Sequence, residues 1–263
     1  MHLGYLEVIK RTLGFKYLGP RGSREVDAIL RPRTEALPLG DNALRVSHLT
    51  VRLDGRTVLE DVTFDVRRGT TLAILGPNGA GKTVLLRTLL GLLPYEGTIA
   101  WSGGTKVGYV PQALFVADVP ITVREFLNMK RGVDVPTTLR SVGLEPDAIV
   151  NDRLGYLSGG ELQRVLIAWA ISDRPDVLLF DEPLSNVDLG GEDLILETLN
   201  RIEKESGITI LLASHDVHHV IAYSDSALAL NRTVVYFGPS KNLSDPSLLA
   251  RVYGRGLLFI HGH

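Results

Sequence analysis

The sequence predicts an α/β fold with a parallel sheet at its centre, joined by an antiparallel β subdomain and an inserted α-helical subdomain. Three observations lead to this prediction. The apolar runs "TTLAIL", "DVLLFDEP" and "ITILLASH" are typical of strands buried on both faces of a parallel sheet. The runs "LRVSHLTVRL" and "VTFDV" alternate as antiparallel strands do. Residues 122 to about 155 have a helical pattern, which opens with Thr122 and Glu125 at capping-box spacing.

Composition excludes several classes of protein. The chain has 263 residues, 44% of them hydrophobic, and a net charge of -2, which argues against a general nucleic-acid binder. Cysteine is absent, and this excludes disulfides, thiolate metal sites and a cysteine nucleophile. No apolar run approaches the roughly 20 residues that span a bilayer, and the first residues lack the apolar core of a secretory signal. We expect the protein to stay in the cytoplasm.

Residues 1–43 form an N-terminal extension that is distinct from the rest of the chain. The stretch "YLEVIKRTLGFKY" predicts a short helix with an apolar face, followed by a linker interrupted by Pro20, Pro32 and Pro38. The extension is either a docking or membrane-surface helix or a poorly ordered segment. The main domain is predicted over residues 44–254, with its helical subdomain at about 113–172 and a tail at 255–263.

The segment "GPNGAGKT" follows the first apolar strand and precedes the helical run "KTVLLRTLLGLL". Its glycines and lysine have the spacing of a loop whose backbone N–H groups surround phosphate at a helix N-terminus. In such a loop Lys82 reaches the β- and γ-phosphates of a nucleotide, and the Thr83 hydroxyl binds Mg²⁺. The alternative is a plain glycine-rich turn. Strand, loop and helix together favour a phosphate-loop NTPase core.

Two acids end the strand "VLLFDE". We expect them beside the phosphate loop of a neighbouring strand, because the carboxyl ends of parallel strands lie at one edge of the sheet. Asp181 then fits the Mg²⁺-holding role, and Glu182 can accept a proton from the attacking water. The alternative is a pair of solvated acids at a strand end.

The segment "LSGGELQRV" supplies a second helix N-terminus that can bind an anion. Ser158 and Glu161 have capping-box spacing, and Gly159 and Gly160 leave the first turn bare. One ATP does not need two helix N-termini from one subunit. This N-terminus therefore suggests a site for an ATP held by another copy of the chain.

Together, "GPNGAGKT", "LSGGE", "FDEP" and "SHD" resemble the ATP-binding cassette (ABC) ATPases over about Leu44 to Gly254. The resemblance implies a homodimer in which two cassettes pair head to tail, with "SNVD" (185–188) crossing the interface. It implies that Gln112 senses Mg²⁺ and links to a membrane partner, and that His215 contacts the γ-phosphate. The predicted catalytic residues are Lys82, Gln112, Glu182 and His215, and the predicted Mg²⁺ residues are Thr83, Gln112 and Asp181. The predicted ATP-binding residues are Leu53, Gly76, Pro77, Asn78, Gly79, Ala80, Gly81, Lys82, Thr83, Val84, Ser158, Gly159, Gly160 and Glu161.

Leu53 departs from the family pattern, which has an aromatic residue stacking on adenine at this position. Leucine offers contact area but no aromatic face. Base–aromatic stacking contributes roughly 1–3 kcal/mol, so we expect either weaker ATP binding or a ring supplied by a partner.

The stretches "KVGYVPQALFVADVPITVREFL", "SHDVHHV" and "FGPSKNL" resemble the ATPase subunits of zinc and manganese importers. This implies membrane-spanning permease subunits, an extracytoplasmic metal-binding protein acting indirectly, and a place on the cytoplasmic face of the cell membrane. Phe126 and Leu127 either receive a permease helix or pack in the core. The terminal "HGH" is either a weak metal contact or a frayed tail.

Two other classes of cassette protein compete with this interpretation. A soluble ATPase in iron–sulfur cluster assembly is compatible with the chain length. A translation or DNA-repair ATPase fits less well, because this chain has one nucleotide domain and no heptads between Lys82 and Leu157.

Overall fold

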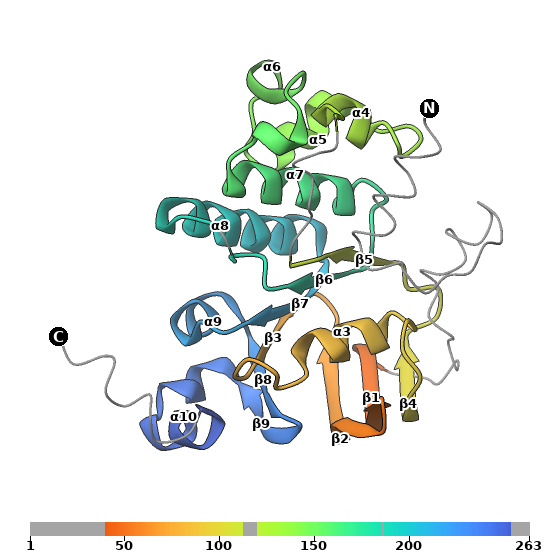
Figure 1. Ribbon diagram of the computed structural model, residues 1–263, viewed down its shortest axis with the longest axis vertical. Coiled ribbons are helices and arrows are strands. Elements are labelled where there is room, and N and C mark those ends of the chain that lie inside the picture. Colours follow the sequence, from red (N-terminus) through yellow and green to blue (C-terminus); the bar gives the residue numbers. More distant parts are fainter. Residues whose placement is uncertain (1–39, 113–119, 186, 254–263) are drawn as a thin grey trace.

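The computed structural model describes residues 40–112, 120–185 and 187–253. These residues form the predicted α/β fold, with a parallel sheet, a smaller antiparallel sheet and a group of helices inserted between two of the parallel strands (Figure 1). The predicted helix in "YLEVIKRTLGFKY" and the terminal "HGH" lie outside the described residues.

The antiparallel sheet has the order β2-β1-β4. Its strands are β1 (Asn42–Leu53), β2 (Arg56–Arg67) and β4 (Glu96–Trp101). The two runs predicted as antiparallel strands are confirmed as β1 and β2, which pair with each other, and alternate residues of both strands are buried because one face of the sheet packs on the core.

The second sheet has six strands in the order β5-β6-β7-β3-β8-β9, and all neighbours are parallel except β8 and β9. Every residue of β3, β6 and β7 is buried, as the continuous apolar runs predict. The strands are β3 (Thr71–Leu75), β5 (Val107–Val110), β6 (Val177–Asp181), β7 (Thr209–Ser214), β8 (Ser226–Asn231) and β9 (Thr233–Pro239).

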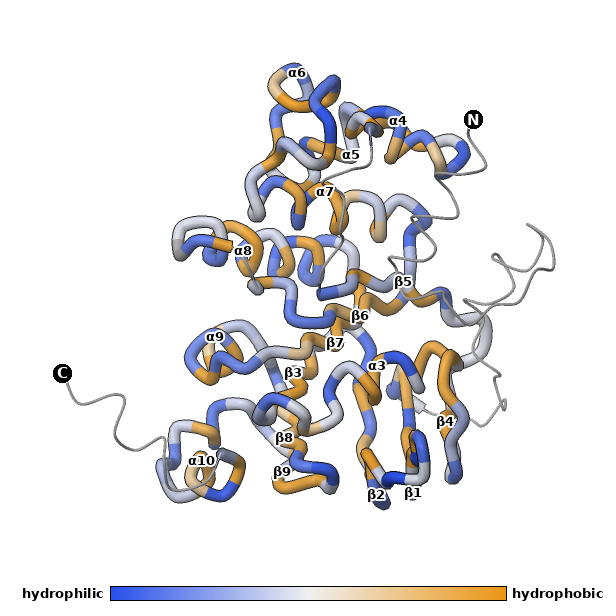
Figure 2. The backbone as a smooth tube through the Cα atoms, viewed as in Figure 1, coloured by the Kyte–Doolittle hydropathy of each residue, from blue (hydrophilic) through white to orange (hydrophobic). Residues whose placement is uncertain are grey.

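The helices pack on two faces of the central sheet. On one face, α3 (Lys82–Leu89) contacts the sides of β6 and β7 that carry Leu179 and Leu211. On the other face, α7 (Gly159–Ile171) and α8 (Leu189–Ser206) contact Leu178 and Phe180. The helices α9 (Val217–Tyr223) and α10 (Pro246–Tyr253) follow, with the 3₁₀ turn η2 (Ser240–Ser244) before α10. Figure 2 shows the apolar segments gathered along the strands and the inner sides of these helices.

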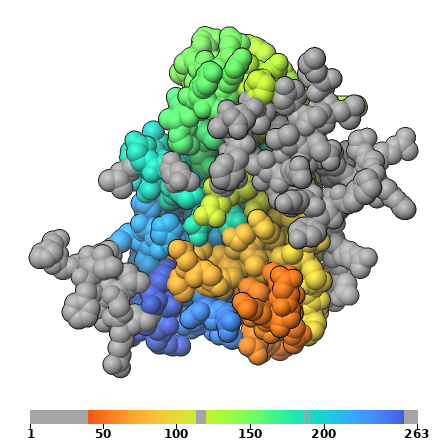
Figure 3. All heavy atoms as spheres, viewed as in Figure 1, coloured from red at the N-terminus to blue at the C-terminus, as the bar shows by residue number. Residues whose placement is uncertain are grey.

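The predicted helical region is broken into short pieces. They are α4 (Val123–Leu127), α5 (Val135–Ser141), α6 (Pro146–Ile149) and the 3₁₀ turn η1 (Leu154–Tyr156). Gly132 precedes α5 at a φ of 75°, Gly143 follows α5 at a φ of 70°, and a proline lies in the first turn of α5 and of α6. These pieces form one end of the molecule and the antiparallel sheet the other (Figure 3).

Phe126 and Leu127 are buried in this helical end, at 1% and 0% exposure. The Phe126 ring stacks on Trp169 of α7 with centroids 5.7 Å apart. Of the two alternatives for these residues, packing in the core is therefore confirmed, because the core of the helical subdomain covers both side chains. Helix α3 is also shorter than the predicted run to Leu93, since Gly91 turns the chain at a φ of 72°.

Candidate functional site

The loop between β3 and α3 depends on glycine at two positions because of close contacts. A side chain at Gly76 would meet the Leu230 carbonyl oxygen at 2.3 Å, and one at Gly81 would meet Leu59 at 2.6 Å. Gly81 also has a φ of 102° as the N-cap of α3, a conformation that disfavours L side chains. The loop therefore lies tightly against the sheet, with Asn78 and Gly79 exposed at its outer turn and Ala80 buried beneath.

Lys82 is the first residue of α3 and is 5% exposed. Its ammonium group donates to the Gly76 carbonyl at 2.8 Å and lies 3.2 Å from Glu182 Oε1. The lysine is thus folded back over the loop, with its charge toward the acid that ends β6.

Glu182 connects the predicted catalytic residues. Besides Lys82, its carboxylate accepts a hydrogen bond from Gln112 Nε2 at 3.1 Å and lies 3.7 Å from His215 Nδ1. Its own φ is 50°, a left-handed conformation rare for non-glycine residues, and its N–H donates to the Ala213 carbonyl. Such strain persists only where the surrounding structure holds it, and it commonly marks a functional site.

Asp181 lies next to Glu182 but has different partners. Its Oδ1 accepts a hydrogen bond from the Thr83 hydroxyl at 2.8 Å, and its Oδ2 accepts one from the Tyr109 hydroxyl at 3.2 Å. Burial raises the pKa of the Asp181 carboxyl, and the hydrogen bonds from Thr83 and Tyr109 together with the nearby positive charge of Arg87 offset the lost hydration only in part. A buried carboxylate beside a hydroxyl offers the hard oxygen ligands that Mg²⁺ takes, so the residues present fit this ion.

We expected the two acids to lie on a strand adjacent to β3, and this prediction is wrong. Strand β7 separates β6 from β3 in the sheet. The contacts still form, because the side chains of Asp181 and Glu182 reach Thr83 and Lys82 past the end of the intervening strand. His215 follows that same strand, which explains its place beside Glu182.

The segment "LSGGE" begins α7 with the predicted capping box. The Ser158 hydroxyl accepts from the Glu161 N–H, and the Glu161 carboxylate accepts from the Ser158 N–H at 2.9 Å. Ser158 and Gly159 are exposed, whereas Gly160 is buried. Because α3 and α7 pack on opposite faces of the sheet, this N-terminus belongs to a different layer from the phosphate loop.

A cavity of about 270 Å³ lies beside Glu182 at the carboxyl edge of the sheet. It is lined by Glu182, Pro183, Leu184, Ser185, Val187, Glu192, Ala213, Ser214, His215, Asp216 and His219. The predicted interface segment "SNVD" thus adjoins the acid and the histidine, with residue 186 outside the described residues.

Ser185, which belongs to the predicted interface segment, donates to the Glu182 carbonyl at 2.9 Å. Two other polar residues of the site were not singled out from the sequence. Tyr253 of α10 donates to the His215 carbonyl at 3.4 Å. Tyr109 is the second, and a signal for it existed. In the sheet it pairs with Leu179, two residues before Asp181, so strand alternation puts both polar groups on one face.

Comparison with known proteins identifies the family. The family model described as "ABC transporter" matches residues 59–185. The zinc import ATP-binding protein ZnuC 1 of Hahella chejuensis is 36% identical over 215 residues, covering 80% of this chain and 83% of the relative. ZnuC of Yersinia pseudotuberculosis is 36% identical over 226 residues, covering 83% and 89%.

The chain belongs to the ABC transporter family. Solved structures agree with this assignment. A transporter described as metal-chelate type, in an inward-facing conformation, has a TM-score of 0.73 at 27% identity, over 80% of this chain and 88% of that one. CbiO1 of Clostridium perfringens, part of the transporter complex cbiONQ, has a TM-score of 0.69 at 26% identity, over 81% and 94%.

The family resemblance, the α/β fold and the ATPase activity predicted from the sequence are therefore confirmed. This ABC ATPase is the nucleotide-binding subunit of a transporter, and the iron–sulfur alternative finds no support among its relatives. Within the part of the chain that the structure describes, no helix is both long and apolar enough to cross a membrane.

Proposed function

We propose that this ABC ATPase powers the import of zinc, or of manganese, through a membrane-spanning permease. The observation that carries the proposal is the set of relatives: the proteins from Hahella chejuensis, Yersinia pseudotuberculosis and Ruegeria pomeroyi are all named as zinc import ATP-binding proteins, at 36%, 36% and 37% identity. An extracytoplasmic metal-binding protein would deliver the ion, and the ATPase would act at the cytoplasmic face of the membrane.

Two copies of the chain pair head to tail around two ATP molecules in this proposal. Each ATP lies between the phosphate loop of one copy and the N-terminus of α7 in the other. The arrangement of the layers supports this pairing, because one chain holds its phosphate loop and its exposed Ser158 on opposite faces of the sheet. A second copy would supply the exposed helix N-terminus to the nucleotide.

The side chains around Glu182 would divide the catalytic work. When ATP binds, Lys82 leaves Glu182 and contacts the β- and γ-phosphates instead, which frees the Glu182 carboxylate. Glu182 then accepts a proton from the attacking water, and His215, 3.7 Å away, contacts the γ-phosphate. Gln112, hydrogen-bonded to Glu182, reports the state of the site to the permease.

Thr83 and Asp181 would hold Mg²⁺, with Gln112 near it. The ion, when bound, neutralises negative charge on the phosphate oxygens. The chain contributes a carboxylate that Thr83 and Tyr109 fix on both oxygens, so little reorganisation is needed on binding. We further propose residues 44–254 as the cassette and residues 1–43 as an extension outside it.

The proposal is tested by growth under metal limitation. Cells that lack this chain should fail when zinc is chelated and recover when zinc is added back; parallel cultures limited for manganese test the second ion. Cells carrying Glu182→Gln provide the matched control for loss of ATPase activity. Normal growth of the deletion strain under both limitations, with no second importer present, would contradict the metal assignment and leave the ATPase assignment standing.

A further inference from the structure

Tyr253, the last residue of α10, joins the C-terminal helix to two loops of the catalytic edge. Its hydroxyl donates to the His215 carbonyl at 3.4 Å. Burial and the nearby Asp216 raise the pKa of this phenol to about 12, while a hydrogen bond from the backbone of Gly76 opposes the shift. The phenol therefore stays protonated and lies between the start of the phosphate loop and the loop that carries His215.

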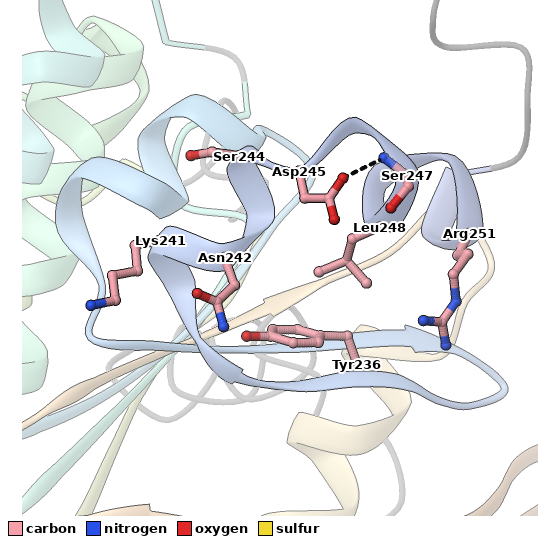
Figure 4. A pocket seen from close by; sticks show the side chains of 8 residues that line it. All are labelled: Tyr236, Lys241, Asn242, Ser244, Asp245, Ser247, Leu248 and Arg251. Carbon is pink, nitrogen blue, oxygen red and sulfur yellow. Dashed lines mark hydrogen bonds between the residues drawn. The ribbon is translucent and has the colours of Figure 1, made fainter.

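Helix α10 is firmly anchored on its inner side. Leu248 and Val252 pack with Ala73 and Leu75 of β3, the strand that leads directly into the phosphate loop. On the outer side, α10 borders an open groove of about 640 Å³ that holds Tyr236, Lys241 and Arg251 (Figure 4). The position of Tyr253 is thus fixed by the same strand that fixes Gly76.

In contrast to Tyr253, the side chain of His215 does little to fix the position of this residue. That side chain is 63% exposed, and its Nδ1 lies 3.7 Å from the Glu182 carboxylate. The position of His215 depends on the backbone around it. The Ser214 hydroxyl accepts a hydrogen bond from the Asp216 N–H at 3.0 Å, and the Tyr253 hydroxyl donates to the His215 carbonyl. A shift of this backbone would move the imidazole relative to the phosphate loop.

We propose that Tyr253 is a positioning residue for ATP hydrolysis: its hydroxyl ties the His215 loop to the phosphate loop and so sets the histidine at the γ-phosphate. This inference rests on the proposed role of His215. Tyr253 lies outside all the nucleotide motifs, 38 residues beyond His215, and acts through that histidine without touching the nucleotide.

The test is Tyr253→Phe, which keeps the ring and removes the hydroxyl. The matched control is Tyr236→Phe on neighbouring β9, whose hydroxyl donates to the Pro239 carbonyl at 2.8 Å, away from the site. We expect Tyr253→Phe to lower kcat about two- to tenfold, the loss that one neutral hydrogen bond can cause, with KM for ATP unchanged. Tyr236→Phe should change neither. An unchanged kcat for Tyr253→Phe would overturn the proposal.

A double-variant cycle separates positioning from general support of the fold. If Tyr253 acts through His215, Tyr253→Phe should have no further effect in the His215→Ala background, measured by single-turnover hydrolysis of labelled ATP. Independent, multiplying effects would overturn the positioning role. Wild-type hydrolysis by His215→Ala alone would instead refute the proposed role of His215, so the two failures are distinguishable.

Discussion

Glu182 shows at the scale of one residue how backbone strain and side-chain contacts concentrate on the proposed catalytic base. Its left-handed backbone turns the carboxylate away from the line of β6 toward Lys82, Gln112 and His215. The sequence predicted these four residues as a catalytic set, but it could not predict the strained φ angle, which depends on the packing of β6 against β7.

Glu182→Gln should keep the shape of the side chain and the hydrogen bond to the site while removing the proton acceptor. Hydrolysis should fall by roughly 10²–10⁴, whereas ATP should still bind and hold a dimer. Steady-state phosphate release and size-exclusion chromatography with ATP measure the two effects. Hydrolysis at the wild-type rate would mean that Glu182 is not the base.

Leu53 offers a second test at this scale. It ends β1, is half-buried, and packs against the cluster that contains Leu59 and Ala80. Leu53→Tyr should add an aromatic face for the base and tighten ATP binding by about 1 kcal/mol or somewhat more. Leu53→Met, which adds no ring, is the control, and fluorescence titration is the measurement. Equal affinities for all three proteins would mean that another residue already covers the base.

At the scale of elements, local patterns predicted caps and strands better than helix lengths. The spacings of Thr122 with Glu125 and of Ser158 with Glu161 predicted two capping boxes, and both are present. The strand β9 and the helix α10 were not predicted, because β9 is half-exposed without strict alternation and α10 has only eight residues. Tyr253 could not be placed for the same reason.

The two capping boxes form a matched pair of variants. Thr122→Ala and Ser158→Ala should each lower the free energy of unfolding by about 1 kcal/mol. Only Ser158→Ala should also slow ATP hydrolysis, because the other cap lies on α4, away from the proposed ATP contacts. Urea unfolding and steady-state hydrolysis measure these effects. Equal activity of both variants would contradict a nucleotide contact at Ser158.

The stability that the capping box of Ser158 and Glu161 contributes should depend on pH. Hydrogen bonds from Ser158 lower the pKa of the Glu161 carboxyl below its ordinary value. A lowered pKa means that the ionised carboxylate stabilises the fold above the pKa of the unfolded chain, and that this stability is lost as the pH falls through the folded value. The stability difference between wild type and Ser158→Ala should therefore shrink in acid.

At the scale of the whole molecule, the packing of helices on both faces of the central sheet keeps the phosphate loop and the N-terminus of α7 in different layers. Alternate residues of β6 face α3 on one side and the pair α7 and α8 on the other, so the helices that begin at the two proposed anion-binding N-termini cannot share a layer. The sequence suggested a second copy from the presence of two helix N-termini. The placement of α3 and α7 on opposite faces follows from the strand order, and no local sequence pattern specifies that order.

Mixing two inactive variants tests the head-to-tail dimer. Lys82→Ala removes the phosphate-binding lysine, and Ser158→Arg puts bulk and charge where the γ-phosphate of the other copy would lie while leaving ATP binding to its own phosphate loop. A mixed dimer then contains one intact site, formed by the normal loop of one protomer and the normal α7 N-terminus of its partner. Random pairing should restore about a quarter of wild-type hydrolysis.

The control is a mixture of Lys82→Ala with the double variant Lys82→Ala/Ser158→Arg, which has no intact loop and should stay inactive. If each chain completed its own site, the first mixture would stay inactive as well, which would contradict the composite site.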